Sequence, residues 1–173
     1  LYMFHTGDTQ WAKLDACFQV IEQGEPSLVS DTDTAGFVDP SLILDENGEL
    51  LLFYLPGTLG SNPAGCESYP CTKEMHSATV SDDFNTLTQI DGARASLELT
   101  DGAFSDPDII EFGDDGYLLY VSSGQNTMVF SGSDLNSLFT VPDSFSLAEN
   151  GTIRISDNEG GVPTAIVIDL SLI

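Results

Sequence analysis

The side chains of this chain that could take part in chemistry are mainly carboxylates. Asp39 and Asp106 stand out among them, because each is followed by proline and each opens an apolar run that is typical of a β-strand. An aspartate in that position can accept local backbone N–H bonds while the proline fixes φ, which is a structural role. It can also contact a ligand or act as an acid or a base. The residues alone leave these three roles open.

Nothing in the sequence points to a nucleophilic triad. His5 and His76 are the only histidines, no serine near them belongs to a nucleophile elbow, and there is no phosphate-binding glycine loop. Cys66 and Cys71 bracket a short loop, so they form either a local disulfide in an oxidising compartment or two reduced thiols. A zinc site is not expected, because His76 stands alone and the cysteine spacing is not C-x-x-C.

The charge balance excludes several classes of partner. The chain has 173 residues with 28 acidic and 4 basic side chains, a net charge of -24. Four scattered basic residues are too few to bind nucleic acid or an anionic membrane surface, and no apolar run is long enough to span a bilayer. With 41% hydrophobic residues, the chain is expected to be soluble and to fold around a core.

Internal repetition is the most informative feature of the sequence. The run from Asp39 to Gly57 and the run from Asp106 to Gly124 share an Asp-Pro opening, an apolar segment, an acidic Gly turn, a second apolar segment and a closing Gly, 67 residues apart. Residues 78–90 match residues 129–141 at an offset of 51. The difference of 16 residues falls in the Gly, Pro and Cys-rich stretch 58–74, which we interpret as a loop insertion.

These repeats predict an all-β fold, a β-propeller of four-stranded antiparallel blades, with Asn47-Gly48 and Asp115-Gly116 as hairpin turns. A β-sandwich or barrel with similar hairpins is the alternative. The predicted units of this single partial propeller are 1–36, the end of a blade; 37–102, a blade with the insertion; 103–159, a second blade; and 160–173, the first strand of the next. A ring needs 4 to 8 blades, so we expect either a homo-oligomer or a longer polypeptide to complete it.

The repeated pattern resembles the five-bladed propellers of the furanosidase-like glycoside hydrolase family 43 and 32 superfamily. The residues that carry the resemblance are Asp39-Pro40, Asp106-Pro107 and the aromatic strands that follow their Gly turns. The resemblance implies a carbohydrate-active protein with a glycan ligand. Asp39 would be a base and Asp106 an aspartate that tunes a pKa or stabilises the transition state.

The family's general acid is a glutamate in a later blade, and this chain departs from that pattern. The matching opening strand carries Val162, and Glu149 is the nearest substitute. The alternatives are therefore a glycan-binding or degenerate propeller module without catalysis, and a structural piece completed by oligomerisation.

Side chains that could contact a sugar are Trp11 and Tyr69, whose ring faces can stack on it, and His76. No cofactor is expected; calcium on Asp31 and Asp33 or on Asp114 and Asp115 is an alternative to a solvated acidic face, although neither pair follows an EF-hand loop. With a local disulfide and a glycan ligand, the expected location is extracellular or periplasmic.

Overall fold

The chain folds as an all-β protein in the computed structural model, which confirms the predicted fold class. The structure describes residues 2–5, 10–57, 65–112, 116–123, 126–142, 144–147 and 153–156. No helix occurs in these ranges. The strands are β1 (Tyr2–His5), β2 (Gln10–Leu14), β3 (Val20–Gly24), β4 (Ser27–Val29), β5 (Phe37–Leu44), β6 (Leu50–Pro56), β7 (Cys71–Val80), β8 (Thr86–Leu99), β9 (Ser105–Glu111), β10 (Tyr117–Ser123), β11 (Asn126–Gly132), β12 (Ser144–Leu147) and β13 (Ile153–Ser156).

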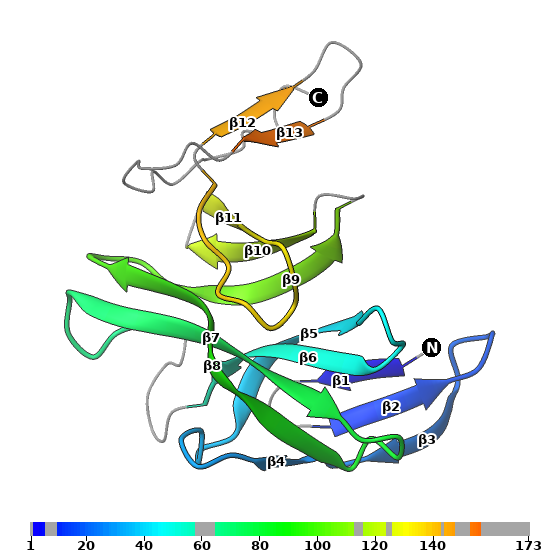
Figure 1. Cartoon of the computed structure of the whole chain (residues 1–173). Helices are drawn as coiled ribbons and strands as arrows, with labels where there is room; N and C mark the ends of the chain where they lie inside the picture. The colour runs from blue at the N-terminus through cyan, green and yellow to red at the C-terminus, as the bar shows by residue number, and fades with distance from the viewer. Residues whose placement is uncertain are drawn as a thin grey trace.

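These strands form four sheets (Figure 1). The largest has the order β4-β8-β7-β6-β5, in which consecutive strands from β5 to β8 pair antiparallel and the short β4 pairs parallel to β8. The other sheets are β1-β2-β3, β9-β10-β11 and the hairpin β12-β13. Each sheet with three or more strands therefore contains a meander of neighbours in sequence.

The predicted hairpin at Asn47-Gly48 joins β5 to β6. Gly48 has a φ of 81°, a conformation that glycine adopts without strain. The Asp45 carboxylate accepts the backbone N–H bonds of Asn47 at 2.9 Å and Glu49 at 2.7 Å. These hydrogen bonds hold the Asp45 carboxyl pKa below its usual value against the opposing effect of desolvation, which is the largest single influence.

The turn between the third and fourth strands of each repeat has the same local structure in both copies. In the first copy the backbone N–H of Asn85 donates to Asp83 at 3.1 Å, and in the second copy the N–H of Asn136 donates to Asp134 at 2.9 Å. These two pairs are 51 residues apart, the offset found in the sequence. The second half of the sequence repeat is therefore also a structural repeat.

The strand β6 explains why the sequence reads as an apolar run. Its side chains alternate between two cores, with Leu51, Phe53 and Leu55 on one face and Leu52 and Tyr54 on the other. A strand buried on both faces has no polar positions to show. The first core also takes in residues of β9, β10 and β11, so the two larger sheets share it.

The predicted insertion at 58–74 ends earlier than expected. β7 already begins at Cys71, because its first residues pair with the last residues of β8, from Cys71 with Leu99 to Met75 with Ala95. The connection from β6 to β7 is therefore residues 57–70. Residues 58–64 of it lie outside the described residues.

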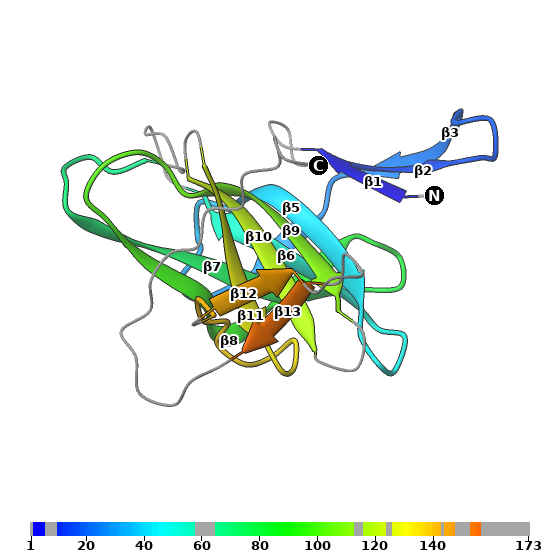
Figure 2. The same cartoon turned by 90° about the horizontal axis from the view of Figure 1, so that it is seen from above.

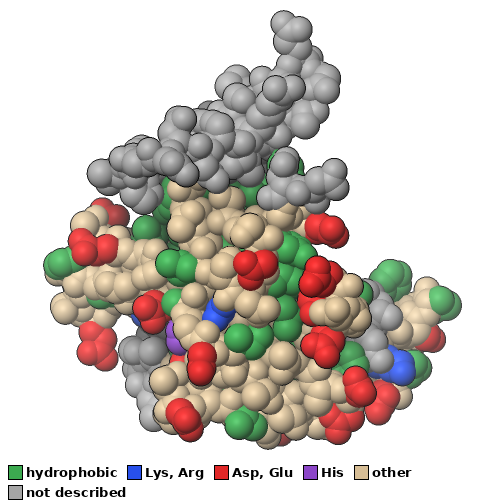
Figure 3. All heavy atoms as spheres, in the orientation of Figure 1, with side chains coloured by type: hydrophobic (Ala, Val, Ile, Leu, Met, Phe, Trp, Pro, Cys, Tyr) green, Lys and Arg blue, Asp and Glu red, His purple; other side chains and the backbone are tan. Residues whose placement is uncertain are grey.

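The surface follows from the composition. Acidic side chains are spread over the visible face of the molecule, separated by uncharged groups (Figure 3). This spacing lowers repulsion between like charges, since each carboxylate remains in contact with solvent.

Candidate functional site

Both Asp-Pro pairs occupy a β-bulge at the start of an inner strand. Asp39 and Pro40 on β5 lie opposite one residue of β6, and Asp106 and Pro107 on β9 lie opposite one residue of β10. The φ angles of Asp39 and Asp106 are 51° and 50°, in the left-handed region. Residues before proline normally adopt an extended backbone, so this conformation is unusual at both positions. Bulges of this kind redirect a side chain away from the regular strand pattern.

The two aspartates lie next to each other in space. The backbone N–H of Asp106 donates to Asp39 Oδ2 at 3.4 Å, and the N–H of Ile109 donates to Ser41 Oγ at 3.2 Å. The hydrogen bonds show that β5 and β9 run side by side in the same direction, as Figure 2 also shows. The structure thus brings together the two carboxylates that were matched by sequence over 67 residues.

The two carboxylates differ in environment. Asp39 is half-buried and Asp106 is exposed. Burial raises the pKa of the Asp39 carboxyl above its usual value; the hydrogen bond from the Asp106 amide opposes this rise, and the negative charge of Asp106 adds to it. A carboxylate with a raised pKa is a better proton acceptor near neutral pH than an ordinary one.

Tyr69 lies at the same end of the sheets as the aspartates. The strands β5, β7 and β9 begin at this end, because β6 and β8 run antiparallel to their neighbours. Tyr69 is 43% exposed, and its hydroxyl donates to the carbonyl of Gly102 in the loop before β9. Its ring is therefore held in place with part of its surface open to a ligand. We call this region, formed by Asp39, Asp106, Tyr69 and Gly102, the Asp-Pro end.

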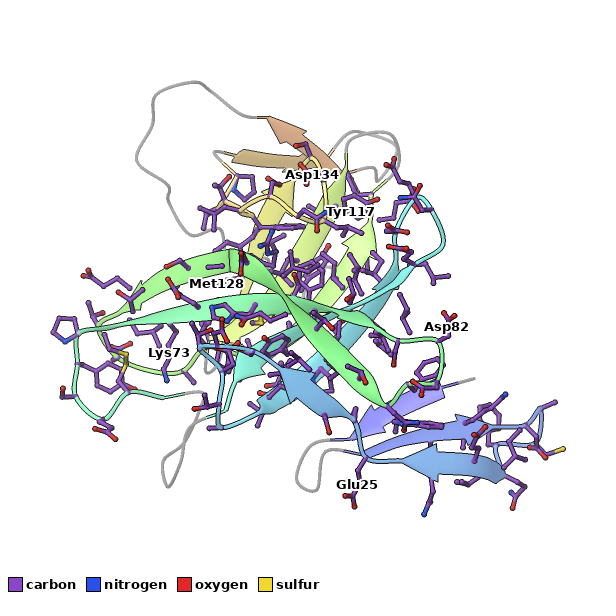
Figure 4. All side chains as sticks on the ribbon, turned by 60° about the horizontal axis from the view of Figure 1, so that its bottom comes forward. Glu25, Lys73, Asp82, Tyr117, Met128 and Asp134 are labelled. Carbon is purple, nitrogen blue, oxygen red and sulfur yellow. A yellow bond between two sulfur atoms is a disulfide. The ribbon has the colours of Figure 1, made fainter. Side chains whose placement is uncertain are left out.

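A disulfide fixes the loop that carries Tyr69. Cys66 and Cys71 are bonded, with their Cα atoms 6.1 Å apart, and Cys17 is an exposed free thiol. The sequence had left open whether Cys66 and Cys71 were bonded or reduced. Figure 4 shows Lys73 and the disulfide at one end of the sheet and Asp82, in the turn between β7 and β8, at the other.

Trp11 is not part of the Asp-Pro end. The indole is 4% exposed, lies against Gly24 of the neighbouring strand, and contacts the ring of Phe84 with 5.5 Å between ring centroids. Its ring is covered by this packing. Stacking on a sugar, which the sequence suggested for Trp11, would require the indole to leave these contacts.

His76 belongs to a buried polar network that the sequence did not predict. Asp33, 7% exposed, accepts hydrogen bonds at Oδ2 from Tyr54 at 2.6 Å and Gln89 at 3.0 Å, and its Oδ2 lies 2.7 Å from His76 Nδ1. Thr32 Oγ1 donates to Asp33 Oδ1 at 3.1 Å. Burial, and then the hydrogen bond to Asp33, raise the pKa of Tyr54 far above its usual value, so this phenol stays protonated as a donor.

Two clefts open beside this network. One of about 570 Å³ lies along β8, and one of about 510 Å³ lies at the end of β6 and the start of β7. Thr32, Glu74 and His76 line both. His76 is therefore a shared wall between two openings, although it is itself only 9% exposed.

Several residues of the sequence predictions lie outside the described residues: Glu149, Val162, Asp114 and Asp115. Of the other carboxylates considered for calcium, Asp33 faces the His76 network and Asp31 is exposed. In the part of the chain that the structure describes, no three His, Cys, Asp or Glu side chains converge to hold a metal ion. Nor does any helix in these ranges have the length and apolarity needed to cross a membrane.

Comparison with known proteins gives no assignment. No protein family, no curated protein and no solved structure matches this chain.

Proposed function

We propose that the chain is a carbohydrate-active module of the propeller type, similar to glycoside hydrolases, that binds a glycan at the Asp-Pro end. One observation carries the proposal: Asp39 and Asp106 adopt the same unusual left-handed conformation in two repeated bulges and lie beside each other. Backbone strain of this kind is concentrated at functional sites, where the surrounding structure maintains it. A purely structural turn could be built with glycine at lower cost.

The two aspartates would have different roles. Asp39, with its raised pKa, would take a proton from the attacking water as general base. Asp106 would keep Asp39 in place through its backbone N–H and contribute negative charge beside the positive charge that develops on the sugar. A protonated carboxyl group must donate to the leaving oxygen, and that acid would come from outside the described residues.

The propeller assignment implies further partners and a location. Adjacent inner strands of neighbouring units would surround a channel, so further units from a second copy or a longer polypeptide would complete the ring. The Cys66–Cys71 disulfide supports an extracellular or periplasmic location, because such bonds persist in oxidising compartments.

A second candidate is a glycan-binding module that does not cleave its ligand. Val162 stands where the other copies have aspartate, which favours this reading. The same Asp-Pro end would then hold a sugar through carboxylate hydrogen bonds and through the exposed ring of Tyr69.

The experiment uses Asp39→Asn, Asp106→Asn and, as a matched control at the opposite end of the sheet, Asp82→Asn. Each protein is tested for hydrolysis of aryl furanosides, aryl pyranosides and plant and microbial polysaccharides, and for binding to the same glycans. For a hydrolase, Asp39→Asn lowers kcat by about 100-fold or more without loss of fold, and Asp82→Asn leaves it unchanged.

The outcomes separate the two candidates. Glycan binding that depends on Asp39 or Asp106, without hydrolysis, supports the binding module. Hydrolysis and binding that are both unaffected by the Asp39 and Asp106 substitutions would exclude the Asp-Pro end as the site.

A further inference from the structure

The network around Asp33 fixes the orientation of the His76 ring. An ionised carboxylate only accepts hydrogen bonds, so the short contact from Asp33 Oδ2 to His76 Nδ1 at 2.7 Å requires the proton to be on Nδ1. Tyr54 and Gln89 donate to the same oxygen and hold it in place. A neutral imidazole carries one N–H, and therefore His76 presents its other nitrogen, Nε2, as an acceptor.

This acceptor faces a second acceptor. His76 Nε2 lies 3.5 Å from Glu74 Oε2, whose side chain is 50% exposed. Among the described residues, no side chain or backbone donor reaches His76 Nε2 by hydrogen bond. Two acceptors at this separation lack the donor that would satisfy both. A group with two or more N–H bonds and a positive charge suits the pair best, because charge-assisted hydrogen bonds are the strongest available.

The larger cleft gives such a group room and a favourable potential. Its volume of about 570 Å³ lies within the range of small-molecule sites. Besides Glu74, the exposed carboxylates Asp31 and Asp91 line it, and its described lining contains no Lys or Arg. Low-dielectric walls with one sign of charge concentrate counter-ions of the other sign. The smaller cleft differs, because Lys73 lines it and disfavours a cation there.

The cleft also offers hydroxyl partners. Ser30, Thr32, Thr88 and Gln89 line it together with the carboxylates. These side chains both donate and accept hydrogen bonds, which matches a ligand that carries hydroxyl groups. Apolar lining is limited, so a purely hydrocarbon amine would leave these groups without partners.

We propose that this cleft binds a small hydroxyl-bearing organic amine, whose ammonium group donates to His76 Nε2 and Glu74 Oε2. Asp33 is a positioning residue in this site, since it acts through the His76 ring. The site is separate from Asp39 and Asp106, and it does not depend on the function proposed for them.

The test uses three probes that share a polyol chain: glucamine, which carries a primary ammonium group, N-acetylglucamine, in which the charge is removed, and sorbitol, which has no nitrogen. Binding is measured by NMR titration of the whole chain at pH 8 and low salt, where imidazole side chains are ordinarily neutral. We expect glucamine to bind at least about 10-fold more tightly than either uncharged probe, with shifts at His76 and Glu74.

Two variants locate the site. Glu74→Gln should weaken glucamine binding by about 10-fold and leave the fold intact, because the side chain is half exposed. Glu111→Gln, which makes the same charge change on β9, should have no effect. The proposal is overturned by equal binding of glucamine and sorbitol, by no glucamine binding at tens of millimolar, or by equal weakening in the two variants, which would indicate a general attraction to the acidic surface.

Discussion

The left-handed conformation at the Asp-Pro bulges makes a stability prediction that differs in sign from the ordinary expectation for a strand. The perturbation is the replacement of Asp106 by Gly, Asn and Ala. All three remove the carboxylate. Gly and Ala both lose the hydrogen bond that Ser105 Oγ donates to Asp106 at 2.9 Å, so this loss cancels when the two variants are compared.

The magnitude follows from the backbone. A residue with a β-carbon is less stable by about 1–2 kcal/mol at a φ of 50°, and glycine is free of this strain. Glycine also makes the unfolded chain more flexible, which costs about 0.4–1 kcal/mol. The Gly variant should therefore be more stable than the Ala variant by about 1 kcal/mol. Asparagine tolerates this region and should stay close to the parent.

The assay is urea unfolding followed by circular dichroism and, independently, thermal unfolding. For a chain of this length, a difference of 1 kcal/mol corresponds to about 2–4 °C in Tm. In an ordinary extended strand, glycine would instead be less stable than alanine by about 0.5–1 kcal/mol. An Ala variant equal to or more stable than the Gly variant would refute the left-handed conformation and the argument for strain that rests on it.

Three further predictions concern the disulfide, the buried network and pH. Reduction of the Cys66–Cys71 bond should lower the free energy of unfolding by about 2 kcal/mol, the value for a loop of about six residues, which urea titration with and without reductant would measure. Asp33→Asn should destabilise the fold by about 2–4 kcal/mol in the same assay, because it disrupts a buried set of charge-assisted hydrogen bonds, whereas the exposed Asp31→Asn should change it by less than about 0.5 kcal/mol. Because burial raises the folded-state pKa of Asp39, its contribution to stability is complete below the unfolded pKa of about 3.9 and is lost as the pH rises through the folded value; urea midpoints of Asp39→Asn should therefore gain on the parent between acid and neutral pH, and parallel pH profiles would contradict this.

The repeated sequence predicted local structure well because turns and strands depend on neighbouring residues. The all-β class and the hairpin at Asn47-Gly48 followed from alternation and turn chemistry within a few residues. The juxtaposition of Asp39 and Asp106 followed from a different kind of signal, since two copies of one unit place equivalent residues at equivalent points. The left-handed φ at both positions could not be predicted, because a residue before proline ordinarily favours an extended backbone.

The Asp33 network was beyond the sequence for a clear reason. Its members, Asp33, Tyr54, His76 and Gln89, are 13 to 56 residues apart, and nothing in local composition links them. Asp33 was interpreted as part of a solvated face because aspartates are seldom buried. Trp11 was expected in a loop because polar residues surround it, whereas packing against Gly24 and Phe84 covers its ring.

The hydrogen bond from the Asp106 amide to the Asp39 carboxylate also affects how the repeats unfold. In a series of structural units, overall cooperativity depends on the interaction between neighbours relative to the stability of each unit alone. Here the first residues of one unit complete the hydrogen bonding of the next, and the shared core of the two larger sheets lies directly beneath them. Opening either inner strand would remove partners from both units at once. The segments from β5 to β11 are therefore expected to exchange their amide hydrogens as a single block.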